Sequence, residues 1–284
     1  MTDKVVPLDE AVGAVRDGST LALTGFAITR NGIAVAHALI RAGRRNLHLT
    51  QVIGGMETDL LAGAGCLDRL TYSGGSLDRF GQLFAVNRAI GDGSLVIEEY
   101  SSLALTFRFL AAGLGLPYLP ARSMLGSDLL QPLLAGGDVR LSEDPFHGGD
   151  VALLSPLQPD VAFVHADVAD EDGNAAVSGP TWALRETALA ARSVIVVCEE
   201  LVPVGTLDPN VVLIPAAIVD AVSVAAHGAH PTAVHGCYDY DRSHLRDYAA
   251  AGREGREAHS SYLDKFVFGV ADHAEYLGLV EVVS

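Results

Sequence analysis

Cysteines and basic residues are both scarce in this sequence, and each shortage excludes a class of protein. The three cysteines, Cys66, Cys198 and Cys237, are odd in number, widely spaced and form no CxxC pair, which predicts no disulfide framework and favours a reducing cytoplasm. Nineteen Lys and Arg stand against 35 Asp and Glu, which gives a net charge of −16. This excess of acid argues against nucleic acid or an anionic membrane as a partner.

Long apolar runs and the common nucleotide and hydrolase motifs are missing as well. No stretch approaches 18 uninterrupted apolar residues, and the first twelve residues contain no apolar secretion signal, so we expect a cytoplasmic protein. The sequence has no GxxxxGK[ST] loop and no GxSxG elbow, and GAGCLD at 63–68 lacks the third glycine of a Rossmann motif and precedes a strand. These absences exclude the standard nucleotide-binding and serine-hydrolase motifs.

The sequence is rich in short apolar runs that alternate with helical patterns, and 49% of its residues are apolar. The expected strands are 19–24, 46–53, 69–73, 94–99, 160–165 and 193–200, and the expected helices are 7–16, 33–43, 103–114 and about 181–191. Strands this apolar predict an α/β fold, an open α/β/α sandwich with a mostly parallel sheet covered on both faces. We expect one domain over 1–284, with an irregular stretch at 117–150 and a helical C-terminal extension at about 240–284.

In such a sheet, ligands bind outside the carboxyl ends of the strands, so the residues that follow each strand are the candidates for a site. These residues are Gly25-Phe26, Gly54-Gly55, Gly74-Gly75, Glu98-Glu99 and the acidic stretch 165–179. Glycine is expected where the backbone approaches a ligand or turns with positive φ, although ordinary turns explain any one pair equally well.

Arg30 and the Glu98-Glu99 pair are the charged candidates. Arg30 lies between a strand and a helix N-terminus, where a guanidinium and free N–H groups suit an anion; the alternative is an arginine that ties the loop down by hydrogen bonds. Alternation sends Glu98 and Glu99 to opposite faces, so at most one points into a cleft as a base or nucleophile. The other is then a solvated or structural acid.

The segment HGAHPTAVHGCYD, residues 227–239, contains ligand types that could hold zinc. They are His227, His230, His235, Cys237 and Asp239. Their spacing matches no established zinc site, so we expect no metal here and a loop whose histidines bond to the backbone.

Four segments resemble the A (alpha) subunit of family I coenzyme A transferases, of the glutaconate CoA-transferase type. They are DGSTLALTGFAITRNGIAVAHALIRAG, IEEYSSLALTFRFLAAGLGLPYLPARSMLGSDL, PDVAFVHADVADEDGNA and VDAVSVAAHGAHPT, and the block HADxADxxGNA is the most specific. The resemblance spans nearly the whole chain. It implies an open α/β/α domain that pairs with a homologous B subunit, usually as α2β2, with acyl-CoA thioesters and carboxylic acids as substrates and no bound cofactor.

In typical members the nucleophile is a glutamate of the B subunit, which forms an acyl anhydride and then a glutamyl-CoA thioester. This chain has no counterpart of that glutamate motif. For this chain the resemblance implies that Arg30 and the N–H groups around Gly25 and Phe26 bind a substrate carboxylate or oxyanion. It also implies that Glu99 lines the cleft and that His165, at its strand end, stands near the subunit boundary.

The resemblance also gives the acidic stretch after His165 a structural role, as a loop that follows a central strand. Gly173-Asn174 is expected to turn the chain, and Asp170 to fix the turn by hydrogen bonds.

Two other functions stay open. Some members of the superfamily are hydrolases or decarboxylases of CoA thioesters, and in a ring-opening hydrolase of steroid breakdown a glutamate of the alpha chain does the chemistry. Alignment places that acid at Glu99, which would activate water for retro-Claisen cleavage. In the other alternative the chain is a non-catalytic subunit whose partner carries the whole reaction.

Overall fold

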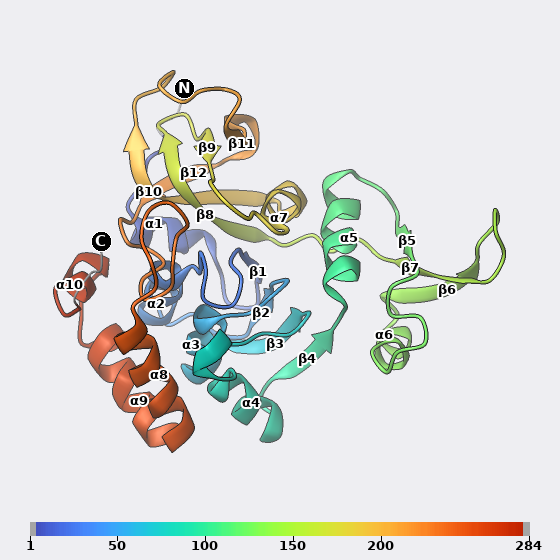
Figure 1. The fold of residues 1–284 in the computed structure, drawn as a ribbon, viewed down its shortest axis with the longest axis horizontal. Coiled ribbons are helices and arrows are strands. Elements are labelled where there is room, and N and C mark those ends of the chain that lie inside the picture. Colours follow the sequence, from blue (N-terminus) through green and yellow to red (C-terminus); the bar gives the residue numbers. More distant parts are fainter. Residues whose placement is uncertain (1–3, 281–284) are drawn as a thin grey trace.

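The computed structural model describes residues 4–280, and its centre is a mostly parallel sheet of nine strands (Figure 1). The strand order is β11-β9-β8-β1-β2-β3-β4, and β10 pairs with both β8 and β12. The bounds are β1 Thr20–Leu23, β2 Leu47–Thr50, β3 Leu67–Tyr72, β4 Val96–Glu99, β8 Val161–Asp170, β9 Ala175–Ala176, β10 Ser193–Val202, β11 Val212–Ile214 and β12 Ala221–Val224. This arrangement confirms the predicted α/β fold with a mostly parallel sheet.

Two halves of the chain meet in the middle of the sheet. Strands β1 to β4 come from the first hundred residues, and β8, β10 and β12 come from the second half. They join where β1 lies parallel to β8, with Leu23 beside Phe163. Because these seven strands are parallel, their carboxyl ends face the same edge, which we call the carboxyl edge.

Helices cover both faces of the sheet, as its apolar strands require. One core contains α2 (Ile33–Arg41), α3 (Met56–Gly63) and the C-terminal helices, packed on β1–β3 and on Val161 and Phe163 of β8. The other contains α7 (Leu184–Ala190), packed on Val164 and Ala166 of the same strand. The remaining helices are α1 Leu8–Ala11, α4 Phe84–Gly91, α5 Ser102–Gly113, α6 Leu130–Gly136, α8 Arg242–Glu254, α9 Arg256–Leu263 and α10 His273–Leu277.

The segment from about 240 onward is helical, as expected, and packs on the first half of the chain. Tyr248 of α8 donates its hydroxyl to Asp59 of α3 at 2.8 Å. Tyr276 of α10 lies 2.8 Å from the ring of His230. The description of residues 1–284 as a single domain stays a prediction.

The stretch 117–150, which we expected to be irregular, contains regular structure, so that expectation is wrong. It holds β5 (Leu119–Ala121), α6 and β6 (Val139–Glu143), which form a three-stranded antiparallel sheet with β7 (Asp150–Leu154) in the order β5-β7-β6. This small sheet lies to one side of the main body (Figure 1). Only the first residue of β6 is buried, so the strand shows none of the alternation that would identify it.

The helix expected at 7–16 is also shorter than predicted. Only Leu8–Ala11 is α-helical, and Val12–Ala14 forms a 3-10 turn. Gly13 and the β-branched Val12 both have low helix propensity, and no side chain caps the helix N-terminus.

The acidic stretch is a strand for its first half, so His165 lies in the middle of β8 and not at its end. The ladder with β10 continues as far as Val202 beside Asp170. The turn comes after Asp170, whose carboxylate accepts both the backbone and the side-chain N–H groups of Asn174 at 2.8 Å. Gly173 has a φ of 98°. The predicted role of Asp170 in fixing this turn is therefore confirmed.

Candidate functional site

The loop Thr24–Asn31, which we call the β1 loop, follows β1 at the carboxyl edge and is held in an uncommon backbone conformation. Phe26 and Thr29 exchange two backbone hydrogen bonds of 2.9 Å, which closes a tight turn. Ala27 and Arg30 have φ values of 53° and 58°, which residues other than glycine rarely adopt. Such strain persists only where surrounding contacts enforce it, and it is concentrated at functional sites.

Gly25 is the one residue type that fits the start of the β1 loop. Its φ is 142°, and a Cβ would lie 2.9 Å from the Arg30 carbonyl oxygen. Within residues 4–280 the N–H groups of Gly25 and Ala27 donate no hydrogen bond, whereas that of Phe26 is bound to Thr29. The Phe26 N–H, which we expected to receive a substrate oxygen, is therefore occupied, and its two neighbours are free.

Arg30 is buried and bound from two sides. Its side chain is 1% exposed and forms an ion pair with Asp167, while Nη2 donates to the Ser178 carbonyl at 2.9 Å. The Asp167 carboxylate also accepts the N–H of Ser178. Of the two roles left open by the sequence, these contacts are those of an arginine that ties the loop down.

Gly54-Gly55 and Gly74-Gly75 allow neighbouring strand ends to approach one another closely. Gly54 N–H donates to the Gly74 carbonyl at 3.0 Å. A Cβ on Gly55 would lie 2.3 Å from the Ala27 carbonyl, and one on Gly75 would lie 2.8 Å from the Gly54 carbonyl. These glycines are therefore required by backbone packing within the chain.

An aromatic pair lies on the outer side of the β1 loop. The rings of Phe26 and Trp182 are stacked, with centroids 4.5 Å apart and planes 11° apart. Trp182 is the only tryptophan of the chain and is 40% exposed. The hollow beside the pair, lined by Thr24 and Val52 among others, has a volume of about 20 Å³, enough for about one water molecule. The pair therefore presents an apolar surface and not a deep pocket.

His165 belongs to a buried polar cluster centred on Glu199, which the sequence analysis did not single out. His165 Nε2 lies 2.7 Å from Glu199, and Tyr238 donates its hydroxyl to the same carboxylate at 2.6 Å. The backbone N–H of His227 is a third donor. Burial raises the pKa of Glu199, but these hydrogen bonds outweigh burial and hold it below the ordinary 4.5. The sequence signal was available, because Glu199 closes an apolar strand as Glu98 does.

Glu98 and Glu99 point to opposite faces of β4, as alternation predicts. Glu98 accepts hydrogen bonds from Arg69 at 2.6 Å and from Thr71 at 2.9 Å. Glu99 is exposed and pairs in register with Tyr72. Glu98 is thus the structural acid of the pair, and Glu99 is free to face a ligand or a partner.

The predicted site residues fall into two places at the carboxyl edge. Three of them belong to the β1 loop, and His165 on the adjacent strand donates its N–H to Thr24 Oγ1 at 3.1 Å. Glu99 stands apart on the edge strand, three strands from β1. At about 4.8 Å per strand this is about 14 Å, so this chain alone does not bring Glu99 to the β1 loop.

Two acids of α3, Glu57 and Asp59, are fully buried, and the sequence analysis missed both. Burial raises the pKa of Glu57 from 4.5 to about 7, although the Gln51 side chain donates to its carboxylate. Burial raises that of Asp59 from 3.8 to about 6, although it accepts N–H groups of the first turn of α4 and the Tyr248 hydroxyl. Acids in the first turn of a helix are ordinary, so nothing in METDLL distinguishes them from solvated residues.

The histidines of 227–239 find most of their partners within the protein among side chains, and not in the backbone as expected. His230 lies 2.8 Å from the Tyr276 hydroxyl and 3.3 Å from the Asp241 carboxylate. In the part of the chain that the structure describes, no group of three or more His, Cys, Asp or Glu is placed to hold a metal ion.

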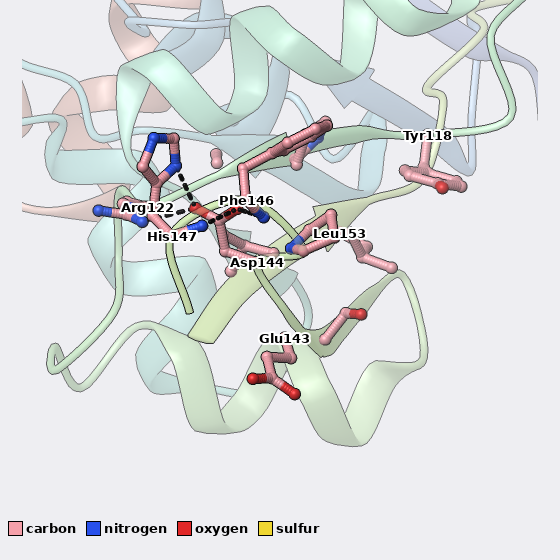
Figure 2. A pocket seen from close by; sticks show the side chains of 12 residues that line it. Tyr118, Arg122, Glu143, Asp144, Phe146, His147 and Leu153 are labelled. Atoms are coloured by element: carbon pink, nitrogen blue, oxygen red, sulfur yellow. Dashed lines mark hydrogen bonds and ion pairs between the residues drawn. The ribbon is translucent and has the colours of Figure 1, made fainter. Parts of the chain in front are cut away.

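A larger hollow, of about 660 Å³, lies on the small antiparallel sheet and not at the β1 loop (Figure 2). Its wall contains Asp144, which accepts Arg122 at 2.6 Å and the backbone N–H of Phe146 at 2.9 Å. Phe146 itself is 86% exposed. These contacts stabilise a hairpin, and we keep the carboxyl edge around the β1 loop as the candidate site.

The family model for coenzyme A transferases matches residues 5–225, well over half of the chain. The chain belongs to the coenzyme A transferase family. The alpha-type (A) chain of a 3-oxoadipate CoA-transferase of Pseudomonas knackmussii is 33% identical to it, and the match covers 96% of each chain. The solved glutaconate coenzyme A-transferase of Acidaminococcus fermentans has a TM-score of 0.90 at 29% identity, covering 97% of this chain and 92% of the other. These findings confirm the predicted family, enzyme class and fold, and the protein is a coenzyme A transferase chain of the alpha type.

The same family includes other chemistry. The IpdA chain of a cholesterol ring-cleaving hydrolase of Mycobacterium tuberculosis is 32% identical, over 88% of this chain and 89% of that protein. A longer protein of Archaeoglobus fulgidus is 35% identical, and this chain spans 63% of its length. Among the helices that the structure describes, none has both the length and the apolar character needed to cross a bilayer.

Proposed function

We propose that this chain, with a homologous B subunit in an α2β2 assembly in the cytoplasm, moves CoA between a CoA thioester and a carboxylic acid, and that the β1 loop is its contribution to the active site. The observation that supports this most is the loop itself. Its left-handed residues are held in place by the Arg30–Asp167 pair, and its free N–H groups sit at the carboxyl edge. A fixed donor of this kind suits an oxygen that gains negative charge as a carbonyl is attacked.

The chain's residues divide the work in this proposal. The N–H groups of Gly25 and Ala27 receive the carbonyl oxygen of the thioester or an oxygen of the acceptor carboxylate. Arg30 keeps the loop in place, and His165 with Glu199 fixes the strand beside it. The covalent nucleophile is a glutamate of the B subunit, because this chain has no counterpart of the family's glutamate motif.

The test is a reconstitution with the B subunit encoded by the same organism. Incubation of the complex with an acyl-CoA and a second carboxylic acid should give the second acyl-CoA, measured by chromatography. Borohydride added after the acyl-CoA should reduce one glutamate of the B subunit, detected by mass spectrometry. A complex that forms but neither transfers CoA nor yields a reduced glutamate rules out covalent transfer.

The second candidate is hydrolysis of a CoA thioester with carbon–carbon cleavage, in which Glu99 activates water. It is favoured by the exposed position of Glu99 at a strand end and by the similarity to the ring-cleaving hydrolase. Hydrolysis would release a cleaved product without any acceptor acid. Glu99→Gln should then abolish the reaction, and Glu98→Gln serves as the matched control, because Glu98 is bound to Arg69.

A purely supporting role for the chain is tested by the same complex. Substitution of Arg30, Glu99 and His165, one at a time, should leave the kinetics of the complex unchanged if the partner carries the whole reaction. Transfer through the β1 loop predicts instead that Arg30→Ala lowers kcat.

A further inference from the structure

Glu57 lies at the start of α3, directly beneath the β1 loop. The Gln51 side chain donates to one carboxylate oxygen, Oε1, and the same amide accepts the Thr58 hydroxyl at 2.6 Å. The other oxygen, Oε2, points toward Gly55, where an added Cβ would lie 2.9 Å from it. Glu57 is therefore fixed on one side and faces the loop on the other.

Asn31 connects Glu57 to the loop. Its amide nitrogen would lie 2.2 Å from a Cβ on Gly55 and 3.0 Å from a Cβ on Gly25, so the amide sits between these two glycines. Neither amide atom of Asn31, nor Glu57 Oε2, completes a hydrogen bond within residues 4–280. The Asn31 amide is nevertheless close enough to lower the pKa of the carboxyl group. A buried amide and a buried carboxylate oxygen thus face each other with hydrogen-bonding capacity to spare.

The protonation state of Glu57 determines which amide atom suits this contact. An ionised Oε2 only accepts, so it favours the Asn31 nitrogen; a protonated Oε2 donates, so it favours the Asn31 oxygen. The two states differ by a half-turn of the amide that packs against Gly25. The structure has the nitrogen on the Gly55 side, which is the arrangement of the ionised form.

The charged and titratable groups on the elements packed around α3 gather about Asp59 and not about Glu57. Tyr248 of α8 binds Asp59, His259 of α9 binds Tyr248, and Arg88 of α4 lowers the pKa of Asp59. Those nearer the loop are His37 of α2, a ring that packs against Tyr276, and Arg30, which is paired with Asp167. The neighbours that act on Glu57 itself are amides and backbone N–H groups.

We propose that Glu57 is a positioning residue, which holds the Asn31 amide between Gly25 and Gly55 and thereby keeps the β1 loop in the conformation that receives the substrate. The proposal rests on the function proposed above for the β1 loop. Glu57 touches no reacting atom in this scheme; it acts through Asn31. Ionised Glu57 supports the active conformation.

The first test is the pH profile of kcat/KM for the reconstituted complex, measured between pH 5.5 and 8.5. The wild-type value should rise about fivefold with a midpoint near pH 7. Glu57→Gln carries one donor and one acceptor, as protonated Glu does, so its profile should stay within about twofold of the acid-limb value of the wild type. Glu57→Ala should lower kcat further, and Asp59→Asn, on the same helix, should keep the wild-type midpoint.

The second test needs no catalysis and uses the isolated chain. Trp182 stacks on Phe26 of the β1 loop, and it is the only tryptophan, so its emission reports on the loop. The emission should shift with a midpoint near pH 7 in the wild type and in Asp59→Asn, and should show no such shift in Glu57→Gln.

The two tests separate the failure of each proposal. If the complex transfers CoA but Glu57→Gln retains the wild-type midpoint in kinetics and emission, the positioning role is refuted. If the wild-type complex transfers no CoA, the proposed function fails, and the titration of Trp182 emission still decides whether Glu57 controls the loop.

Discussion

Replacement of Glu57 by glutamine should make the protein more stable at alkaline pH, although it removes a buried charged group. The pKa of Glu57 is raised from 4.5 to about 7 by burial, so the folded state binds this proton more tightly than the unfolded chain. For such an acid, the free energy of unfolding falls as the pH rises from the unfolded pKa to the folded one. Glutamine carries no charge at any pH, so the variant escapes this loss.

The magnitude follows from the two pKa values. One pKa unit corresponds to about 1.4 kcal/mol, so a rise from 4.5 to about 7 corresponds to roughly 3 kcal/mol at pH 8. At pH 5.5, where the group is already ionised in the unfolded chain but protonated in the folded one, about 1 kcal/mol of this loss has accumulated. Relative to wild type, Glu57→Gln should therefore gain about 2 kcal/mol in free energy of unfolding between pH 5.5 and pH 8.

Urea denaturation followed by circular dichroism at several pH values measures this difference directly. Taking the difference between the two proteins removes the contributions of all other titrating groups, including Asp59 and Glu199. The exposed Glu10→Gln is the control, and its difference from wild type should stay within about 0.5 kcal/mol at every pH. A stability difference for Glu57→Gln that is constant with pH, or that moves against the variant as the pH rises, refutes the reasoning.

Three further predictions concern the site. Arg30→Met should lower the free energy of unfolding by about 3–5 kcal/mol in urea denaturation, because it leaves the buried Asp167 carboxylate without its cation. Gly25→Ala should reduce kcat/KM of the reconstituted complex at least tenfold, because its Cβ would press on the β1 loop. Tyr238→Phe should cost about 1 kcal/mol of stability at pH 7, measured by the same denaturation, because Glu199 loses one of its three donors.

Matched variants show whether each effect is local. Gly43→Ala also places a Cβ at positive φ, but in open space, and should leave kcat/KM unchanged. Tyr240→Phe removes the hydroxyl of a ring outside the Glu199 cluster and should leave stability unchanged. An Arg30→Met variant as stable as the wild type would contradict the assignment of Arg30 as the anchor of the loop.

The central sheet could be predicted because its strands are buried on both faces and are therefore continuously apolar, as in TLAL at Thr20–Leu23 and VAFV at 161–164. The small sheet could not, because four of the five residues of β6 are exposed and its strands have only three to five residues. The second half of β8 was missed for a different reason. Its acids indicated a loop, whereas Asp167 is neutralised inside the sheet by Arg30, 137 residues earlier in the chain.

The site divides in the same way. Gly25 could be singled out because a glycine after a strand reports a local backbone requirement, and the φ of 142° fulfils it. The importance of Glu57 and Glu199 could not be foreseen, because an acid in a helix or strand reveals its burial only through distant partners. For Glu199 these are His165 and Tyr238, each more than 30 residues away.

The way the small sheet is inserted has a consequence for how such proteins diversify. It leaves the main sheet after the edge strand β4 and returns through β7 to β8, which lies against β1 at the centre. Its own core, built around Tyr100, Phe109 and Leu154, is separate from the cores on the two faces of the main sheet. Residues 117–154 can therefore lengthen, shorten or change composition during evolution while the junction of Leu23 with Phe163 keeps its register, so that relatives can acquire new outer surfaces on an unaltered reaction platform.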